Sequence, residues 1–104
     1  MDAILVYMTA PNMDEARAIA SALVEERLAA CANVLPHMES VYQWKGKMER
    51  DSEVVVIAKT KASLADRLTA RVLELHSYEV PCVVTMPVTG GNPAFLAWID
   101  GETQ

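Results

Sequence analysis

The order of predicted secondary structure most constrains this chain, because a strand–helix–strand pattern occurs twice around a long central hairpin. Apolar runs predict strands at Ala3–Thr9 and Val80–Val88. Between them, helix-period apolar patterns begin after Asn12 and at Ser63, and two extended stretches flank a turn at Gly46. The order β-α-β-β-α-β plus a C-terminal helix predicts an α+β, ferredoxin-like split βαβ sandwich, with residues 1–104 as one domain.

Caps and prolines predict where the elements end. Asn12 is a typical N-cap, and Glu15 three residues later is expected to close a capping box. The first helix is expected to end near Arg27 or Leu28. Pro36 is expected to interrupt the second strand, because proline cannot donate a hydrogen bond to a sheet.

The central hairpin is too long for its own domain to cover. Its arms, Cys31–Trp44 and Met48–Thr60, each span about 43 Å at roughly 3.3 Å per extended residue. A compact body of this chain length measures only about 35 Å. Apolar side chains near the turn would then be exposed, so we expect oligomerisation, with Tyr42 and Trp44 as interface anchors.

Charge and hydropathy exclude two classes of partner. The formal net charge is −5 and the basic residues are scattered, whereas nucleic-acid binding needs clustered positive charge. The longest apolar runs, Ala3–Met8 and Val54–Ala58, are far shorter than the roughly 20 residues of a membrane helix. No export signal is recognisable at the start. We expect no nucleic acid and no membrane as partners, and a cytoplasmic location.

The two cysteines, Cys31 and Cys82, give no zinc-site spacing and no disulfide framework. The topology places their strands at opposite edges of the sheet, on the order of 14 Å apart, which is beyond disulfide reach. Two reduced, buried thiols are therefore one interpretation. The other is that oligomer formation brings Cys31 of one copy near Cys82 of another.

No catalytic constellation is recognisable. The chain has no Gly-x-Ser-x-Gly nucleophile motif, and no glycine-rich nucleotide loop follows the first strand. We therefore expect a protein that is not an enzyme.

Five sequence words, in order and in register, resemble the CutA family of divalent-cation tolerance proteins. Leu28–Val34 reads LAACANV, Ser40–Lys47 reads SVYQWKGK, and Lys59 begins a KT pair. His76–Cys82 reads HSYEVPC where the family has HPYEVPE, and the segment from Gly91 reads GNPAFLAWI. The resemblance implies a ferredoxin-like fold, a stable homotrimer similar to PII signalling proteins, and tolerance of divalent cations with copper binding.

The resemblance also implies candidate metal ligands. Some members use a thiol near the end of the first strand and a His-His pair, and the matching positions here are Met8, Leu75 and His76. Imidazole and thioether groups suit copper, and Cys82 in place of the family's Glu offers a softer donor. Alternatively, His76 caps a helix C-terminus and Met8 fills the core. The metal-ligand prediction is His76, Met8, Cys31 and Cys82, with copper as the ion.

Two other function classes remain open beside metal-ion response. A PII-like signalling trimer would hold a small anionic metabolite in clefts between subunits, with Lys59, Tyr78 and Trp44 as candidate contacts. A structural scaffold for partner proteins is the third class. Each candidate residue also has a structural interpretation, because aromatic residues dominate buried interfaces and a strand-end lysine is usually solvated.

Overall fold

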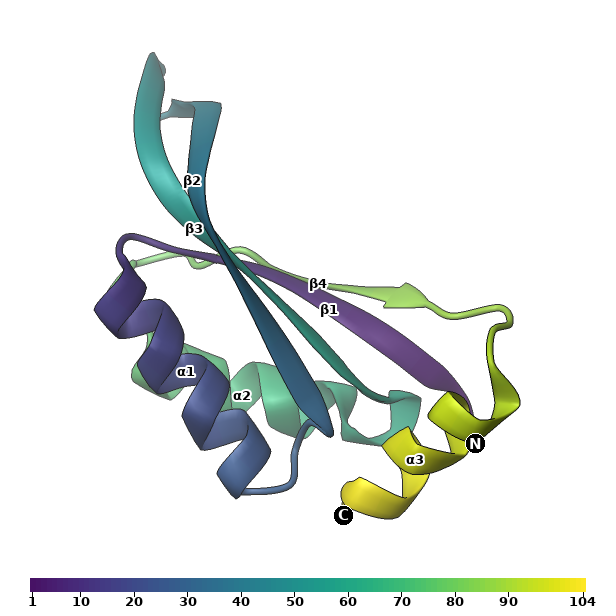
Figure 1. Ribbon diagram of the computed structural model, residues 1–104. Coiled ribbons are helices and arrows are strands. Elements are labelled where there is room, and N and C mark those ends of the chain that lie inside the picture. Colours follow the sequence, from purple (N-terminus) through teal and green to yellow (C-terminus); the bar gives the residue numbers. More distant parts are fainter.

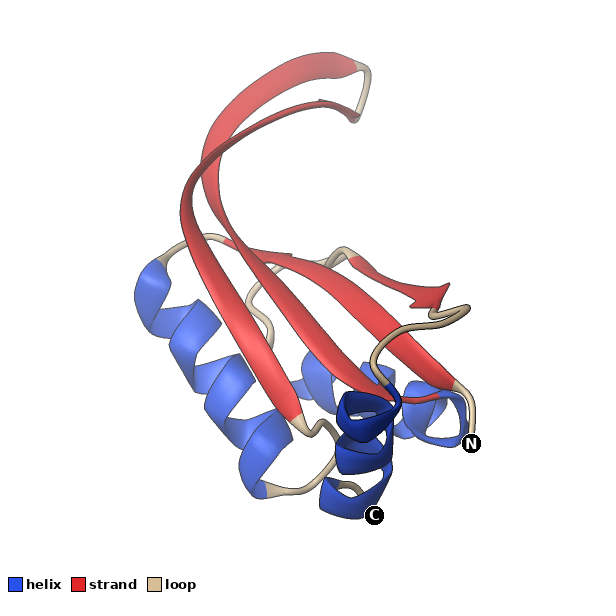
Figure 2. Ribbon diagram, turned by 45° about the vertical axis from the view of Figure 1, so that its right-hand side comes forward, coloured by secondary structure: helices blue, strands red, loops and turns tan.

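The computed structural model describes residues 1–104 as a four-stranded antiparallel sheet with helices packed on one face (Figures 1 and 2). In chain order the elements are β1 (Ala3–Ala10), α1 (Met13–Glu25), β2 (Cys31–Trp44), β3 (Lys47–Lys61), a 3-10 turn (Ala62–Leu64), α2 (Ala65–Leu75), β4 (Val83–Pro87) and α3 (Pro93–Glu102). The strand order is β2-β3-β1-β4, so β2 and β4 are the edges, as predicted. The α+β split βαβ arrangement is confirmed. None of the helices is long and apolar enough to cross a bilayer.

The main core lies between the sheet and the helices α1 and α2. The central strand β1 contributes Val6 and Met8, α1 contributes Leu23, and α2 contributes Leu68. Each of these side chains is at most 1% exposed. Full burial of an apolar side chain of this size stabilises the fold by roughly 1.5–3 kcal/mol. Packing alone therefore accounts for the residue type at Met8.

The β2–β3 hairpin extends beyond the body of the molecule, and its far half, residues 38–51, is called the outer hairpin below. The molecule measures 44 Å along its longest axis but only 25 and 23 Å along the others. In Figures 1 and 2 the outer hairpin curves away from the helices as a free arm. It exposes four large apolar side chains by 39–62%: Val41, Tyr42, Trp44 and Met48. The prediction that this chain cannot cover its own hairpin is confirmed.

Pro36 interrupts the pairing of the second strand, as predicted, but it does not end the strand. β2 continues to Trp44, and the pairing with β3 shifts register between Leu35 and Met38. His37 takes a left-handed backbone conformation with φ of 65° at this irregularity. A bulge of this kind leaves residues without ladder partners, so the missing N–H of proline is accommodated while the strand goes on.

The first helix ends at Glu25, earlier than predicted, because the chain closes it with a Schellman motif. The N–H of Leu28 donates to the carbonyl of Leu23 at 2.9 Å, and the N–H of Arg27 donates to Val24 at 3.0 Å. The motif requires a left-handed residue, and Arg27 provides it with φ of 58°. Glycine usually marks this position, so its absence concealed the helix end in the sequence.

Two further boundaries differ from the predictions. The 3-10 turn occupies the expected start of the second helix at Ser63, and the α-helix begins only after it. β4 is shorter than the predicted Val80–Val88, because its pairing with β1 begins only where Val83 meets Met8. The residues before Val83 are not paired in the sheet, and one of them, Pro81, has no N–H to donate to a neighbouring strand.

Candidate functional site

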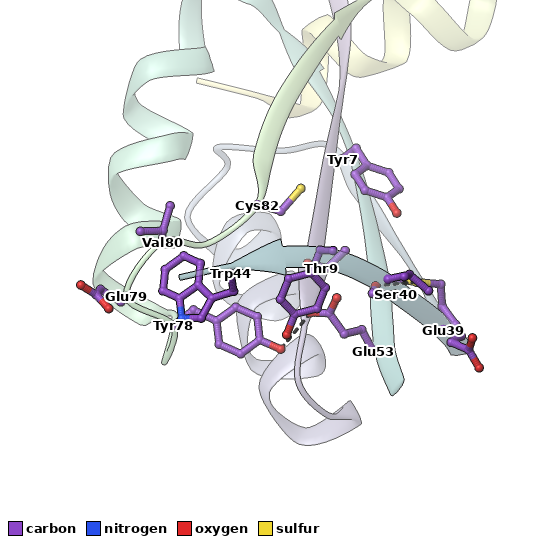
Figure 3. A pocket seen from close by; sticks show the side chains of 13 residues that line it. Tyr7, Thr9, Glu39, Ser40, Trp44, Glu53, Tyr78, Glu79, Val80 and Cys82 are labelled. Carbon is purple, nitrogen blue, oxygen red and sulfur yellow. Dashed lines mark hydrogen bonds between the residues drawn. The ribbon is translucent and has the colours of Figure 1, made fainter. Parts of the chain in front are cut away.

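A pocket of about 730 Å³ lies between the outer hairpin and the segment that joins α2 to β4 (Figure 3). This volume is within the range of roughly 300–1,000 Å³ that is typical of small-molecule sites. Its lining includes three glutamates and no lysine, arginine or histidine. The lining side chains that matter below are Tyr7, Tyr42, Trp44, Glu53, Tyr78 and Cys82.

Glu53 is the buried acidic group of this pocket. It lies on β3 and is only 8% exposed. The Tyr78 hydroxyl donates a hydrogen bond of 2.8 Å to its Oε2 atom, as the dashed line in Figure 3 marks. Glu53 takes part in none of the ion pairs of the chain. The Tyr78 hydroxyl is thus the side-chain group that donates a hydrogen bond to the Glu53 carboxylate.

Burial and nearby carboxylates raise the pKa values of three side chains of the pocket. The pKa of Tyr78 is raised mainly by burial, then by its hydrogen bond to Glu53 and the charge of that carboxylate. The pKa of Cys82 is raised by burial first and by Glu53 second. A hydrogen bond to Asp51 raises the pKa of Tyr42 to about 12. At neutral pH both phenols therefore keep their protons, and Cys82 is a poor source of thiolate.

His76 lies beside the pocket at the end of α2, with its side chain fully buried. Its Nε2 atom is 2.7 Å from the carbonyl oxygen of Thr9, and its Nδ1 atom accepts the backbone N–H of Tyr78 at 3.1 Å. A carbonyl can only accept, so the neutral tautomer with its proton on Nε2 satisfies both contacts. His76 is the C-cap residue of α2, as predicted, and its N–H donates to the carbonyl of Val72 at 2.9 Å. Its ring also ties α2 to β1.

Glu15 has a role that sequence reasoning missed. Asn12 caps α1 as predicted, accepting the Glu15 N–H at 2.9 Å. The Glu15 carboxylate does not close the expected capping box, however. It accepts hydrogen bonds from the Ser77 N–H at 3.1 Å and the Ser77 hydroxyl at 3.0 Å, and lies 3.3 Å from Nδ1 of His76. The sequence signal for this role is the serine at position 77. The similar family word has a proline there, which has neither a backbone N–H nor a hydroxyl group to donate.

The predicted metal ligands are distributed over the chain. Met8 is in the core, and Cys31 is the first residue of the edge strand β2, at the end opposite the outer hairpin. Cys82 lines the pocket, and both cysteines are free thiols. No three side chains of His, Cys, Asp or Glu come together as a metal site within one chain. A metal at His76 would have to displace one of its two hydrogen bonds.

Of the three residues predicted for a cleft between subunits, two line this pocket within one chain and the third lies elsewhere. Trp44 and Tyr78 both line the pocket. Lys59 lies elsewhere on β3, where its ammonium group donates to Asn33 and sits 5.9 Å from the ring centroid of Phe95. The pocket of a single chain therefore has no basic side chain for an anion.

Comparison with known proteins gives one family. Residues 4–102 match the family model described as CutA1 divalent ion tolerance protein. The chain is 45% identical over 101 residues to the chloroplastic protein CutA of Arabidopsis thaliana, covering 97% of this chain. It spans only 56% of that relative's length.

Solved structures agree with the sequence comparison. The crystal structure of CutA1 from Oryza sativa superposes with a TM-score of 0.97 at 42% identity, covering all of this chain and 95% of the other. The periplasmic divalent cation tolerance protein CutA from Archaeoglobus fulgidus superposes with a TM-score of 0.95 at 37% identity, covering 98% and 99%.

Proposed function

Because this chain belongs to the CutA1 divalent ion tolerance family, we propose that it is a non-enzymatic protein of metal-ion response, which binds copper as a homotrimer. The family match over residues 4–102 carries this proposal. The raised pKa values of Cys82 and Tyr78 support a non-enzymatic role, since neither group is activated as a nucleophile.

The uncovered outer hairpin supports a homotrimer. Its exposed apolar side chains and the free edges of β2 and β4 are surfaces that another copy of the chain would cover. Native mass spectrometry at micromolar concentration should give the trimer. Trp44→Ala should weaken it by roughly 3–5 kcal/mol per site if the assembly buries Trp44 fully. A stable monomer of the parent chain would contradict the proposal.

The metal proposal places copper, as Cu(I), on His76 with softer atoms from Met8, Cys31 or Cys82. Soft sulfur donors select Cu(I), which is why a ligand set with Met8, Cys31 or Cys82 points to this oxidation state. Because the two thiols lie on separate parts of one chain, a site that uses both needs contacts between subunits.

A competition titration with a chromophoric Cu(I) chelator under reducing conditions tests this site. The parent chain is compared with His76→Ala and with the double variant Cys31→Ser/Cys82→Ser. We expect His76→Ala to lose Cu(I) affinity. A loss of Cu(I) affinity only in the cysteine variant would indicate that the metal lies at the subunit interface. Unchanged affinity in both variants would show that Cu(I) does not bind at these residues.

The alternative of a PII-like trimer that binds an anionic metabolite is less favoured by the pocket. Three glutamates line it, and Lys59 is not among its residues. An anion would be repelled there. No contact in the structure favours a scaffold role in particular.

We propose a reducing compartment such as the cytoplasm. The two free thiols support it, because thiols of secreted proteins are usually paired. The names of relatives include a chloroplastic and a periplasmic protein, so location varies within the family. Thiol labelling in intact cells tests the redox state of Cys31 and Cys82.

A further inference from the structure

The ring of His76 has more polar neighbours than one neutral imidazole can use at once. The carbonyl oxygen of Thr9 lies 2.7 Å from Nε2. Nδ1 has two neighbours, the N–H of Tyr78 at 3.1 Å and the carboxylate of Glu15 at 3.3 Å. A neutral imidazole carries one proton, so one of its nitrogens donates and the other accepts. The ring therefore has an acceptor beside each nitrogen, and its proton can serve only one of them.

The two neutral tautomers of the ring satisfy different parts of this environment. With the proton on Nε2, His76 donates to Thr9 and accepts from Tyr78. With the proton on Nδ1, the ring donates to Glu15 instead, and the lone pair of Nε2 becomes free. The first tautomer makes two hydrogen bonds and is the resting form. The second keeps the ring uncharged and gains a nitrogen that can act as a ligand.

Glu15 is held beside Nδ1 by Ser77. The N–H and the hydroxyl of Ser77 donate to the Oε2 atom at 3.1 and 3.0 Å, and this is the same oxygen that lies next to the ring. The Glu15 side chain is only 18% exposed and forms no ion pair with a lysine or an arginine. It is thus a charged acceptor in a fixed position, and a hydrogen bond to a charged acceptor is roughly twice as strong as one between neutral groups.

This arrangement fits a histidine that binds a metal ion. Such histidines commonly donate their second ring N–H to a carboxylate or a carbonyl, which fixes the tautomer and makes the ligating nitrogen more basic. His76 has a carboxylate in that place. Thr9 lies on β1, Glu15 lies on α1, and Ser77 and Tyr78 lie between α2 and β4. The outer hairpin and the edge strands, which we assign to subunit contact, supply none of these groups.

We propose that Glu15 is a positioning residue for the copper site: it accepts the Nδ1 proton of His76 and so leaves Nε2 free for Cu(I). This role rests on the proposed function, because it requires His76 as a ligand. The proton moves from Nε2 to Nδ1 within the ring, so none is taken up or released. The hydrogen bond to Thr9 is exchanged for one to a carboxylate, which offsets part of the cost of freeing Nε2.

The Cu(I) competition titration tests this role when it is extended to variants of the carboxylate. Glu15→Gln keeps the shape of the side chain and removes its charge. We expect about tenfold weaker Cu(I) binding, the usual loss when the partner of a ligating histidine is replaced. Ser77→Ala removes one of the two donors that hold Glu15 and should cause a smaller loss. Glu25→Gln is the matched control, because Glu25 is exposed at the other end of α1 and should leave affinity unchanged.

The position of the ring proton separates this role from a general effect on the structure. His37→Asn leaves His76 as the only histidine, so nitrogen NMR of the isotope-labelled ring reports its tautomer alone. We expect the proton on Nε2 in EDTA and on Nδ1 in the presence of Cu(I). Circular dichroism and urea denaturation in EDTA check that Glu15→Gln and Ser77→Ala remain folded.

The possible failures are distinguishable. If His76→Ala loses Cu(I) affinity while Glu15→Gln keeps it, His76 remains a ligand and the role of Glu15 is wrong. A Cu(I)-loaded parent chain that keeps its ring proton on Nε2 would also overturn the role, because Nδ1 would then be the ligand. If the parent chain does not bind Cu(I), or if His76→Ala binds it equally well, both this inference and the proposed copper site are wrong.

Discussion

The Nε2 atom of His76 lies 2.7 Å from the carbonyl oxygen of Thr9, and this contact joins residues 67 positions apart. It fixes the end of α2 against the end of β1, next to the bulged hairpin. Thr9 and Tyr78 both line the pocket, so the histidine ring holds two sides of the pocket in place. A fully buried histidine with two protein partners is a structural residue first, and any metal role must compete with these bonds.

Replacing His76 should therefore destabilise the protein without any metal present. His76→Asn leaves the Thr9 carbonyl and the Tyr78 N–H without their partners, each at a cost of about 1–3 kcal/mol. We expect at least about 2 kcal/mol lower free energy of unfolding, measured by urea denaturation in EDTA. His37→Asn is the matched control, because His37 is exposed and asparagine tolerates its positive φ. Parent-like stability of His76→Asn would contradict this role.

Tyr42 should titrate late because of Asp51. Its ordinary pKa of 10.0 rises to about 12 in the folded chain, chiefly through the hydrogen bond to that carboxylate. The protonated phenol favours the folded state below pH 10, and this contribution is lost as the pH rises toward 12. Absorbance at the phenolate band should show Tyr42 ionising earlier in Asp51→Asn, with Tyr42→Phe identifying the signal. Identical titration curves for the parent and Asp51→Asn would rule out this coupling.

Cys82 should react slowly with alkylating reagents. Burial and the nearby Glu53 raise the pKa of its thiol, so less thiolate is present near neutral pH. In a Cys31→Ser background with EDTA, its rate with iodoacetamide should be lower than that of a free cysteine peptide. Glu53→Gln should speed the reaction only in part, because burial is the larger cause and persists. A rate equal to that of the peptide would contradict the raised pKa.

Local patterns predicted most of the fold because they act through nearest neighbours. The apolar run of β1 and the cap at Asn12 depend on a few adjacent residues, and both are where the sequence placed them. The interruption at Pro36 was predicted, but its form as a shift of register was not, because that depends on the partner strand β3. The end of β4 likewise depends on how far β1 offers partners for pairing.

The site was less predictable, because its decisive contacts join distant segments. Trp44 and Tyr78 were predicted, from the sequence words that contain them, to line a cleft between subunits, and within one chain both line the pocket. Glu53 was missed, since a glutamate at the start of an apolar strand resembles an ordinary solvated strand end. Its burial arises only when the outer hairpin and the segment after α2 cover it. Lys59 lies elsewhere on β3 within one chain, and its place in a cleft between subunits stays a prediction.

The left-handed residue that closes α1 gives a prediction about backbone conformation alone. Arg27 has φ of 58°, where a Cβ atom costs roughly 1 kcal/mol and glycine has no such cost. Arg27→Ala and Arg27→Gly both lose the guanidinium bonds to the carbonyls of Gly101 and Glu102, at 3.1 and 3.2 Å. That loss cancels between them, so the glycine variant should be more stable than the alanine variant by about 1 kcal/mol in urea denaturation.

Arg17 provides the control for this comparison, because it is exposed in the middle of α1. There the order should reverse, with Arg17→Ala more stable than Arg17→Gly by about 1 kcal/mol, since alanine is the better helix former. Opposite signs at the two positions, measured in the same assay, separate backbone conformation from any general effect of glycine. If alanine is also the more stable residue at position 27, the Schellman closure does not set the end of this helix.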